Sequence, residues 1–199
     1  MNTEWLAGLG RSYGFDLTAV GPAIGRALGR RNLARASVTA VPFPSGAFDL
    51  VASFDVLYSL PDDAERQAIE EMWRVLKPGG YVLVNVAAMD ILRGDHSILS
   101  HELRRYSRAQ LRGRLSAQGF EIVRLTYTNQ TLFLPMLAVR TLHRWRGLSG
   151  EADADQEIQV PPAPINAVLS ALLWLESRWL RRFDTLAGSS LMCLARKPA

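Results

Sequence analysis

Asp16 is the first residue in this chain whose type and position suggest chemistry. It follows the short apolar approach "YGF" and precedes a helical pattern. In nucleotide-binding α/β units, a carboxylate at the tip of a strand accepts hydrogen bonds from the ribose hydroxyls. The other interpretation is an N-cap, because "DLTAVGPA" could begin the next helix. Both interpretations require a strand before Asp16 and a helix after it.

A second stretch, "RGDHSILSHELRRYS", collects candidates for acid–base work and for binding an acceptor. His96, His101 and Tyr106 are the candidate catalytic residues. Arg104 and Arg105 could bind an anionic or phosphorylated acceptor. The alternative is a solvated loop with Tyr106 packed at the start of a helix. We expect no metal site, because two histidines five residues apart on a loop are weak evidence for one.

Alternating strands and helices must position these residues. In the first part of the chain we expect helices over 3–11 and 22–30 and strands over 12–16 and 34–39. The continuous apolar run Phe48 to Phe54 predicts a buried strand. Pro61 begins a helix that "KPGG" ends, and strand 81–88 follows. Ser107 caps a helix that runs through Gln118, and the last strands are 120–129 and 189–197.

This order predicts an α/β fold with a mostly parallel sheet and helices on both faces. Residues 129–187 interrupt the pattern with two apolar helices that also carry arginines, 131–146 and 165–182, joined by an acidic, proline-containing segment. We therefore divide the chain into a core over 1–128, a helical cap over 129–187 and a final core strand over 188–199.

The composition bounds the class of protein. With 199 residues and 48% hydrophobic content, the chain can bury the core of one domain. The single cysteine, Cys193, excludes a disulfide framework and fits a cytosolic setting. No basic-then-apolar leader and no apolar run long enough to span a bilayer is present. The net charge of +4 is too modest to predict nucleic-acid binding, for which no recognisable module is present.

Three segments, in this order and spacing, resemble class I S-adenosylmethionine-dependent methyltransferases. "VPFPSGAFDLV" is similar to the family's loop into its fourth strand. "SFDVLYSL" is similar to the segment that lines the methionine end of the cofactor, and "RVLKPGGYVLV" to the helix, turn and fifth strand. The resemblance covers roughly 3–128, and the final strand corresponds to the family's antiparallel seventh strand.

The resemblance implies S-adenosylmethionine as cofactor and a Rossmann-like sheet. Asp16 falls at the ribose-binding acid, although a competing alignment puts Gly21 there. The implied cofactor-binding residues are Asp16, Leu17, Ser37, Val38, Ser53 and Phe54. Ser37 and Val38 correspond to the adenine contacts, and Ser53 and Phe54 to the methionine end. Tyr58 joins Arg104 and Arg105 as a candidate acceptor-binding residue.

The chain departs from the family at its front, where we expect the first strand and its glycine-rich loop to be lacking. The implied function is methyl transfer to a small-molecule or lipid-like acceptor. The alternative is a non-catalytic remnant, or an interaction module, that does not bind the cofactor. For the two cap helices, a lid, a homo-oligomer face and peripheral membrane contact all stay open. The expected location is cytoplasmic, with membrane association as the variant.

Overall fold

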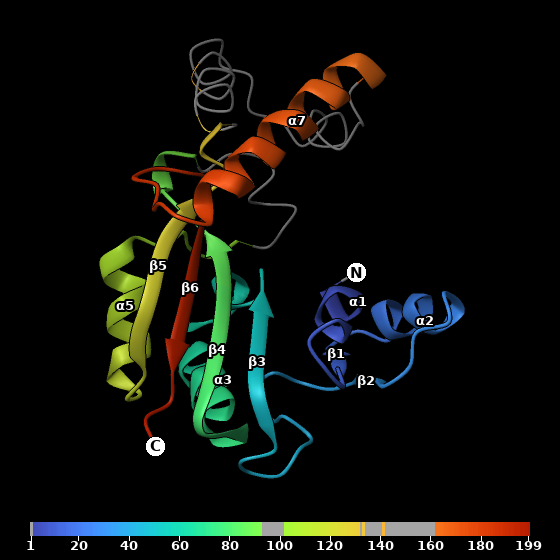
Figure 1. The fold of residues 1–199 in the computed structure, drawn as a ribbon. Helices are drawn as coiled ribbons and strands as arrows, with labels where there is room; N and C mark the ends of the chain where they lie inside the picture. Colours follow the sequence, from blue (N-terminus) through green and yellow to red (C-terminus); the bar gives the residue numbers. More distant parts are fainter. Residues whose placement is uncertain (1, 93–101, 132, 134–140, 142–161) are drawn as a thin grey trace.

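The computed structural model describes residues 2–92, 102–131, 133, 141 and 162–199 (Figure 1). The described strands form two sheets, one two-stranded in the order β1-β2 and one four-stranded in the order β3-β4-β6-β5. β1 (Gly14–Asp16) and β2 (Leu33–Arg35) pair in parallel and flank α2 (Val20–Ala27), and α1 (Asn2–Ala7) precedes them. This order confirms the expected strand–helix–strand unit around Asp16.

The four-stranded sheet carries the buried core. β3 (Phe48–Phe54) pairs in parallel with β4 (Leu76–Ala87). β6 (Ser190–Arg196) lies antiparallel to both β4 and β5 (Glu121–Thr128). Three of the four strands therefore run the same way, and the last strand of the chain is the antiparallel one, as the family resemblance implied.

Two helices cover one face of this sheet. α3 (Asp62–Val75) and α5 (Arg108–Ala117) lie behind it in Figure 1. Their buried side chains pack with the inward residues of β4 and β6, among them Val84 and Cys193. Because Cys193 is fully buried, its pKa is raised to about 12. The core thus lies between α3, α5 and this face of the sheet.

The sequence signal that begins α5 is the one expected, whereas the end of α3 differs from the expectation. Ser107 accepts from the backbone N–H of Gln110, and the Gln110 side chain accepts from the N–H of Ser107, which forms the capping box of α5. "KPGG" behaves differently from the expectation. α3 ends at Val75, and Gly79, with φ 78°, lies inside the irregular start of β4 rather than at the helix cap.

Two helical features lie at the end of the sheet toward which β3 and β4 point. The short 3-10 helix η1 (Leu57–Ser59) follows β3, and η2 (Asp90–Leu92) follows β4. α7 (Ala163–Leu180) stands at the same end and leads back into β6 (Figure 1). Most of the expected helix 131–146 lies outside the described residues.

Candidate functional site

A carboxylate and an amide mark the carboxyl ends of β3 and β4. Asp55 directly follows β3 in the left-handed conformation, with φ 57°. Its N–H donates to the Asn85 carbonyl at 3.0 Å, and Asn85 Nδ2 donates to Asp55 Oδ1 at 3.1 Å. Partial burial raises the pKa of Asp55, although the hydrogen bond from Asn85 opposes this. The site therefore has an oriented carboxylate that takes up a proton more readily than an ordinary aspartate.

Tyr58 and a buried ion pair lie beside this carboxylate. Burial, followed by the charges of Asp55 and Glu102, raises the pKa of Tyr58. The Tyr58 carbonyl accepts from the N–H groups of Leu103 and Arg104 at 3.0 and 3.3 Å. The segment that begins at Glu102 is thus fixed against η1, next to the end of β3.

Arg105 faces the interior of the protein. Its Nε and Nη2 donate to the two carboxylate oxygens of Glu102 at 3.0 and 3.1 Å, and its Nη1 donates to the Ala88 carbonyl at 3.1 Å. Arg105 is 6% exposed. This finding argues against the expectation that Arg105 binds an external anion, because the guanidinium already has an internal counter-ion and a carbonyl partner.

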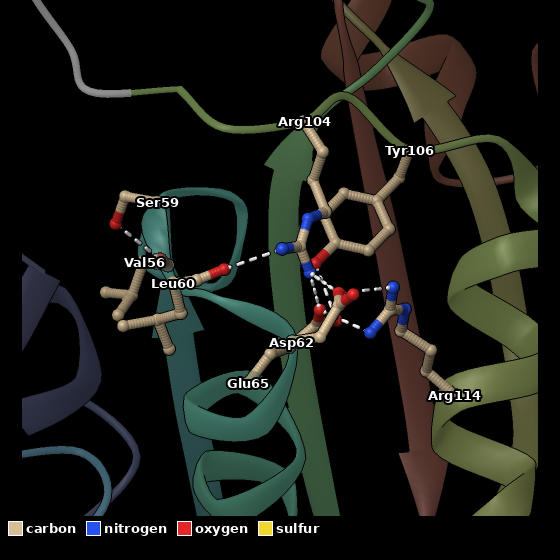
Figure 2. Close-up of polar contacts among 8 residues, drawn as sticks. All are labelled: Val56, Ser59, Leu60, Asp62, Glu65, Arg104, Tyr106 and Arg114. Atoms are coloured by element: carbon tan, nitrogen blue, oxygen red, sulfur yellow. Dashed lines mark hydrogen bonds and ion pairs between the residues drawn. The ribbon is translucent and has the colours of Figure 1, made fainter.

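Arg104 and Tyr106 belong to a second network, centred on Glu65 (Figure 2). Tyr106 is 1% exposed, and its hydroxyl donates to Glu65 Oε1 at 2.6 Å. Glu65 also pairs with Arg104 and with Arg114, whose Nη1 lies 2.6 Å from Oε2. Arg104 Nη2 donates to the Leu60 carbonyl at 2.8 Å. Burial and the bond to Glu65 raise the pKa of Tyr106, so this hydroxyl is poorly suited to act as a base.

The burial of Tyr106 agrees with the alternative drawn from the sequence, a tyrosine packed at a helix start. The residue immediately precedes the N-cap of α5. We therefore assign Tyr106 and Arg104 to the framework that joins α3 to α5. His96 and His101 lie outside the described residues.

Asp16 ends β1 as an exposed carboxylate. Its Oδ1 accepts from the N–H of Thr18 at 2.8 Å and from Thr18 Oγ1 at 2.9 Å. These bonds form a local turn two residues long rather than an N-cap, because α2 begins at Val20 with Ala19 as its N-cap. The turn holds the carboxylate in one orientation at the strand end, and Leu17 beside it is 68% exposed.

The other expected cofactor contacts also follow strands. Ser37 and Val38 come after β2, and Ser37 Oγ lies 2.7 Å from Thr39 Oγ1. Ser53 and Phe54 are the last residues of β3, and Phe54 is half-buried. Ser53 is 5% exposed, and its Oγ has no hydrogen-bond partner in the described structure.

Asp55, Asn85 and Glu102 were not among the predicted site residues, although Asp55 directly follows the predicted methionine-end contacts Ser53 and Phe54. Asn85 carried a usable signal, since it is the one polar side chain within the apolar run "YVLVNVAA". Glu102 carried none, because its place depends on how the chain returns from β4 to α5. Among the described residues, no group of three or more potential metal ligands lies together.

Known methyltransferases are similar to this chain in sequence and in fold. A family model described as a methyltransferase domain matches residues 1–84. The ubiquinone/menaquinone biosynthesis C-methyltransferase of Pseudoalteromonas translucida is 32% identical over 80 residues, which are 40% of this chain and 30% of that relative. The matching segments span only 28% to 30% of the curated relatives.

Solved structures extend the likeness along the whole chain. A SAM-dependent methyltransferase from Methanosarcina mazei has a TM-score of 0.59 and 14% identity, and covers 100% of this chain and 87% of its own. The cyclase SpnF has a TM-score of 0.55 and 23% identity, and covers 94% of this chain and 66% of its own. At these identities the likeness concerns the fold.

Proposed function

Because this chain has the class I S-adenosylmethionine-dependent methyltransferase fold, we propose that it transfers a methyl group from S-adenosylmethionine to a small-molecule or lipid-like acceptor. The observation that carries the proposal is the oriented Asp55–Asn85 pair at the carboxyl ends of parallel strands β3 and β4. Open α/β sheets bind their ligands outside this edge.

Some of the described residues could hold the ribose, the adenine and the methionine end of S-adenosylmethionine. Asp16 is held at the end of β1 by Thr18 and would accept from the ribose hydroxyls. Ser37 and Val38 would lie toward the adenine. The buried, unpartnered Ser53 Oγ is the polar atom that a bound ligand would satisfy. When bound, the cofactor supplies an electrophilic methyl group, so much of the rate can come from alignment of the acceptor.

We assign the acceptor side of the site to Asp55 and Tyr58. Because its pKa is raised, the Asp55 carboxylate is suited to take a proton from the group that becomes methylated, or to accept a hydrogen bond from it. Tyr58 orients the acceptor from η1. His96 and His101, which lie outside the described residues, stay candidate acid–base groups from the sequence.

Isothermal titration with S-adenosylmethionine tests the proposal on the 199-residue chain. We expect saturable binding that Asp16→Asn weakens by about 10- to 150-fold, the equivalent of a charge-assisted hydrogen bond of about 1.5–3 kcal/mol. Asp49→Asn is the matched control, since Asp49 is exposed and pairs with Lys77 at the start of β4.

The same titration separates the proposal from the alternative, a methyltransferase-like remnant without cofactor binding. The split of the described strands into two sheets favours that alternative, because the two-stranded unit that carries Asp16 does not pair with β3. No heat of binding from a folded protein, or an equal affinity for wild type and Asp16→Asn, would contradict the proposed site.

A further inference from the structure

α7 displays a row of exposed apolar side chains along its length. The row recurs at alternating intervals of three and four residues, and we call it the α7 stripe: Ile165, Val168, Leu172, Leu175 and Trp179. Each of its side chains is between 37% and 60% exposed. At this spacing the five residues occupy one face of the helix. Exposed apolar residues that are contiguous in this way mark an interaction surface.

The protein holds α7 by a different side of the helix. Leu169, Leu173 and Leu180 are half-buried, and Glu176 is 7% exposed. The Glu176 carboxylate accepts from the N–H groups of Gln130 and Thr131 at 3.0 and 2.9 Å. The stripe is therefore not the face that fixes α7 to the sheet.

The exposed charges of α7 and of the two residues that follow it are positive, and the next acid, Asp184, pairs with Arg124. Glu176 is the only acid in the helix, and it is buried in the contacts above. Arg178, Arg181 and Arg182 are exposed, and Arg178 lies over the ring of Trp174, 4.9 Å from its centroid. A bare apolar stripe beside tryptophan and arginine, on a helix that has no exposed acid, complements an anionic interface.

We propose that the α7 stripe docks onto an anionic lipid surface, with the helix lying in the interface. A second copy of α7 fits less well. In a parallel pair the arginines would face each other, and in an antiparallel pair they would meet the amino-terminal half of the helix, which has no acid. Among the described helices none is long and apolar enough to cross a bilayer, so the helix lies on the surface.

The position of α7 relative to the candidate site indicates what docking would do for function. α7 stands at the end of the sheet toward which β3 and β4 point, where Asp55 lies (Figure 1). Docking would bring this edge to the lipid surface and select an acceptor that resides there. This consequence for the acceptor rests on the proposed function, whereas the docking itself requires neither cofactor nor activity.

Vesicle flotation tests the docking on the full chain. The probes are phosphatidylcholine vesicles with and without phosphatidylglycerol, at low and high salt. We expect binding to the anionic vesicles that weakens with salt. Val168→Glu together with Leu175→Glu should lower the bound fraction at least about tenfold, since each side chain would lose its insertion. Arg178→Gln with Arg182→Gln should remove the preference for phosphatidylglycerol.

Two controls keep the result interpretable. Val123 is 55% exposed, close to the 60% of Val168, but lies on edge strand β5, so Val123→Glu should bind vesicles as wild type does. Arg112→Gln on α5 is the matched charge control. Circular dichroism of each variant establishes that it is folded.

Three outcomes would overturn the proposal. One is a wild-type protein that floats with neither vesicle, and another is an equal loss in Val123→Glu. The third is a vesicle-independent dimer in sedimentation that Val168→Glu converts to a monomer, which would assign the stripe to a second copy. The cofactor titration is unaffected by any of these, so failure of the docking is distinct from failure of the proposed function.

Discussion

Glu65 is a fully buried carboxylate whose partners come from the segment just before α5 and from α5 itself. It accepts from Tyr106 and pairs with Arg104 and Arg114. Glu65→Gln would remove the buried one of the two carboxylates that both guanidinium groups share, since exposed Asp62 also pairs with Arg104 and Arg114. We expect it to lower the free energy of unfolding by about 2–3 kcal/mol, below the usual cost of a broken buried pair because both arginines retain solvent contact.

Urea unfolding measures this effect, and α3 offers a control. Glu70 lies on the same helix but pairs with Arg66 at the surface, with side-chain exposures of 45% and 63%. Glu70→Gln should therefore cost less than about 0.5 kcal/mol. Equal losses for the two variants would show that Glu65 is not the centre of the network in Figure 2.

For single residues, the sequence indicated which side chains take part in polar networks, but it did not indicate their partners. Arg104, Arg105 and Tyr106 were singled out as possible contacts for an acceptor, and all three are engaged inside the protein. A run of arginine and tyrosine looks the same whether its counter-ions are external or internal. The partners Glu65 and Glu102 are fixed by tertiary packing, which no local pattern encodes.

Among the elements, α7 is attached in part through one buried carboxylate, Glu176. Burial alone would raise the pKa of Glu176, but the N–H and hydroxyl donors of Thr131 and the N–H of Gln130 lower it below the ordinary 4.5. The unfolded chain therefore binds a proton more readily than the folded one. The stabilisation is fully present above pH 4.5 and is lost as the pH falls through the lowered folded pKa.

Hydrogen exchange of residues 163–180 across this pH range measures the attachment. Glu176→Gln should weaken it by about 1–3 kcal/mol at neutral pH, through loss of charge-assisted hydrogen bonds. The difference between wild type and Glu176→Gln should shrink as the solution becomes acidic, which separates Glu176 from other carboxylates that titrate there. A difference that does not change with pH would contradict this assignment.

Substitution by alanine at two glycines should change the stability of the protein in opposite directions. Gly188 precedes β6, and a Cβ there would lie 2.2 Å from the Thr128 carbonyl oxygen. Gly188→Ala must therefore push β5 and β6 apart at their paired ends and destabilise the fold. Gly113 lies in α5, where an added Cβ would meet nothing within 4 Å, so Gly113→Ala should stabilise the protein by about 0.5–1 kcal/mol. Thermal melting of the two variants compares the signs.

The elements themselves were largely predictable. The apolar run Phe48–Phe54 is β3 with the bounds expected, and the Ser107 signal is the start of α5. The end of α3 was not, because "KPGG" suggests a helix cap, whereas Leu76 already pairs with Phe48 of β3 and begins β4. Pairing across strands decides such a boundary, and it is not visible in a local window.

At the scale of the whole molecule, an aromatic cluster links the two sheets. Tyr13, before β1, contacts Phe43 and Phe48 with ring centroids 5.5 and 6.0 Å apart, and Phe43 and Phe48 are 4.9 Å apart. Phe43→Ala should lower the protection of residues 14–35 from hydrogen exchange by about 2 kcal/mol, because it removes the ring between them. β4 and β6 should stay protected.

Phe120→Ala provides the contrast at this scale. Phe120 is 3% exposed and packs on Trp73 within the core of the four-stranded sheet. Its loss should destabilise that unit by about 3–5 kcal/mol and affect every amide in β4 and β6. Identical exchange patterns for the two variants would mean that the sheets unfold as one unit. The division of the chain into core and cap stays a prediction from the sequence.

The rate at which a reagent labels the single thiol of the chain reports how often the sheet opens. Cys193 is fully buried on β6, paired with Val84 on one side and Leu125 on the other, and its raised pKa of about 12 keeps it protonated. A disulfide reagent can therefore label it only after these strands separate. The labelling rate of the native protein should follow the global unfolding equilibrium. Fast labelling with intact far-ultraviolet dichroism would reveal that β6 detaches while the helices persist.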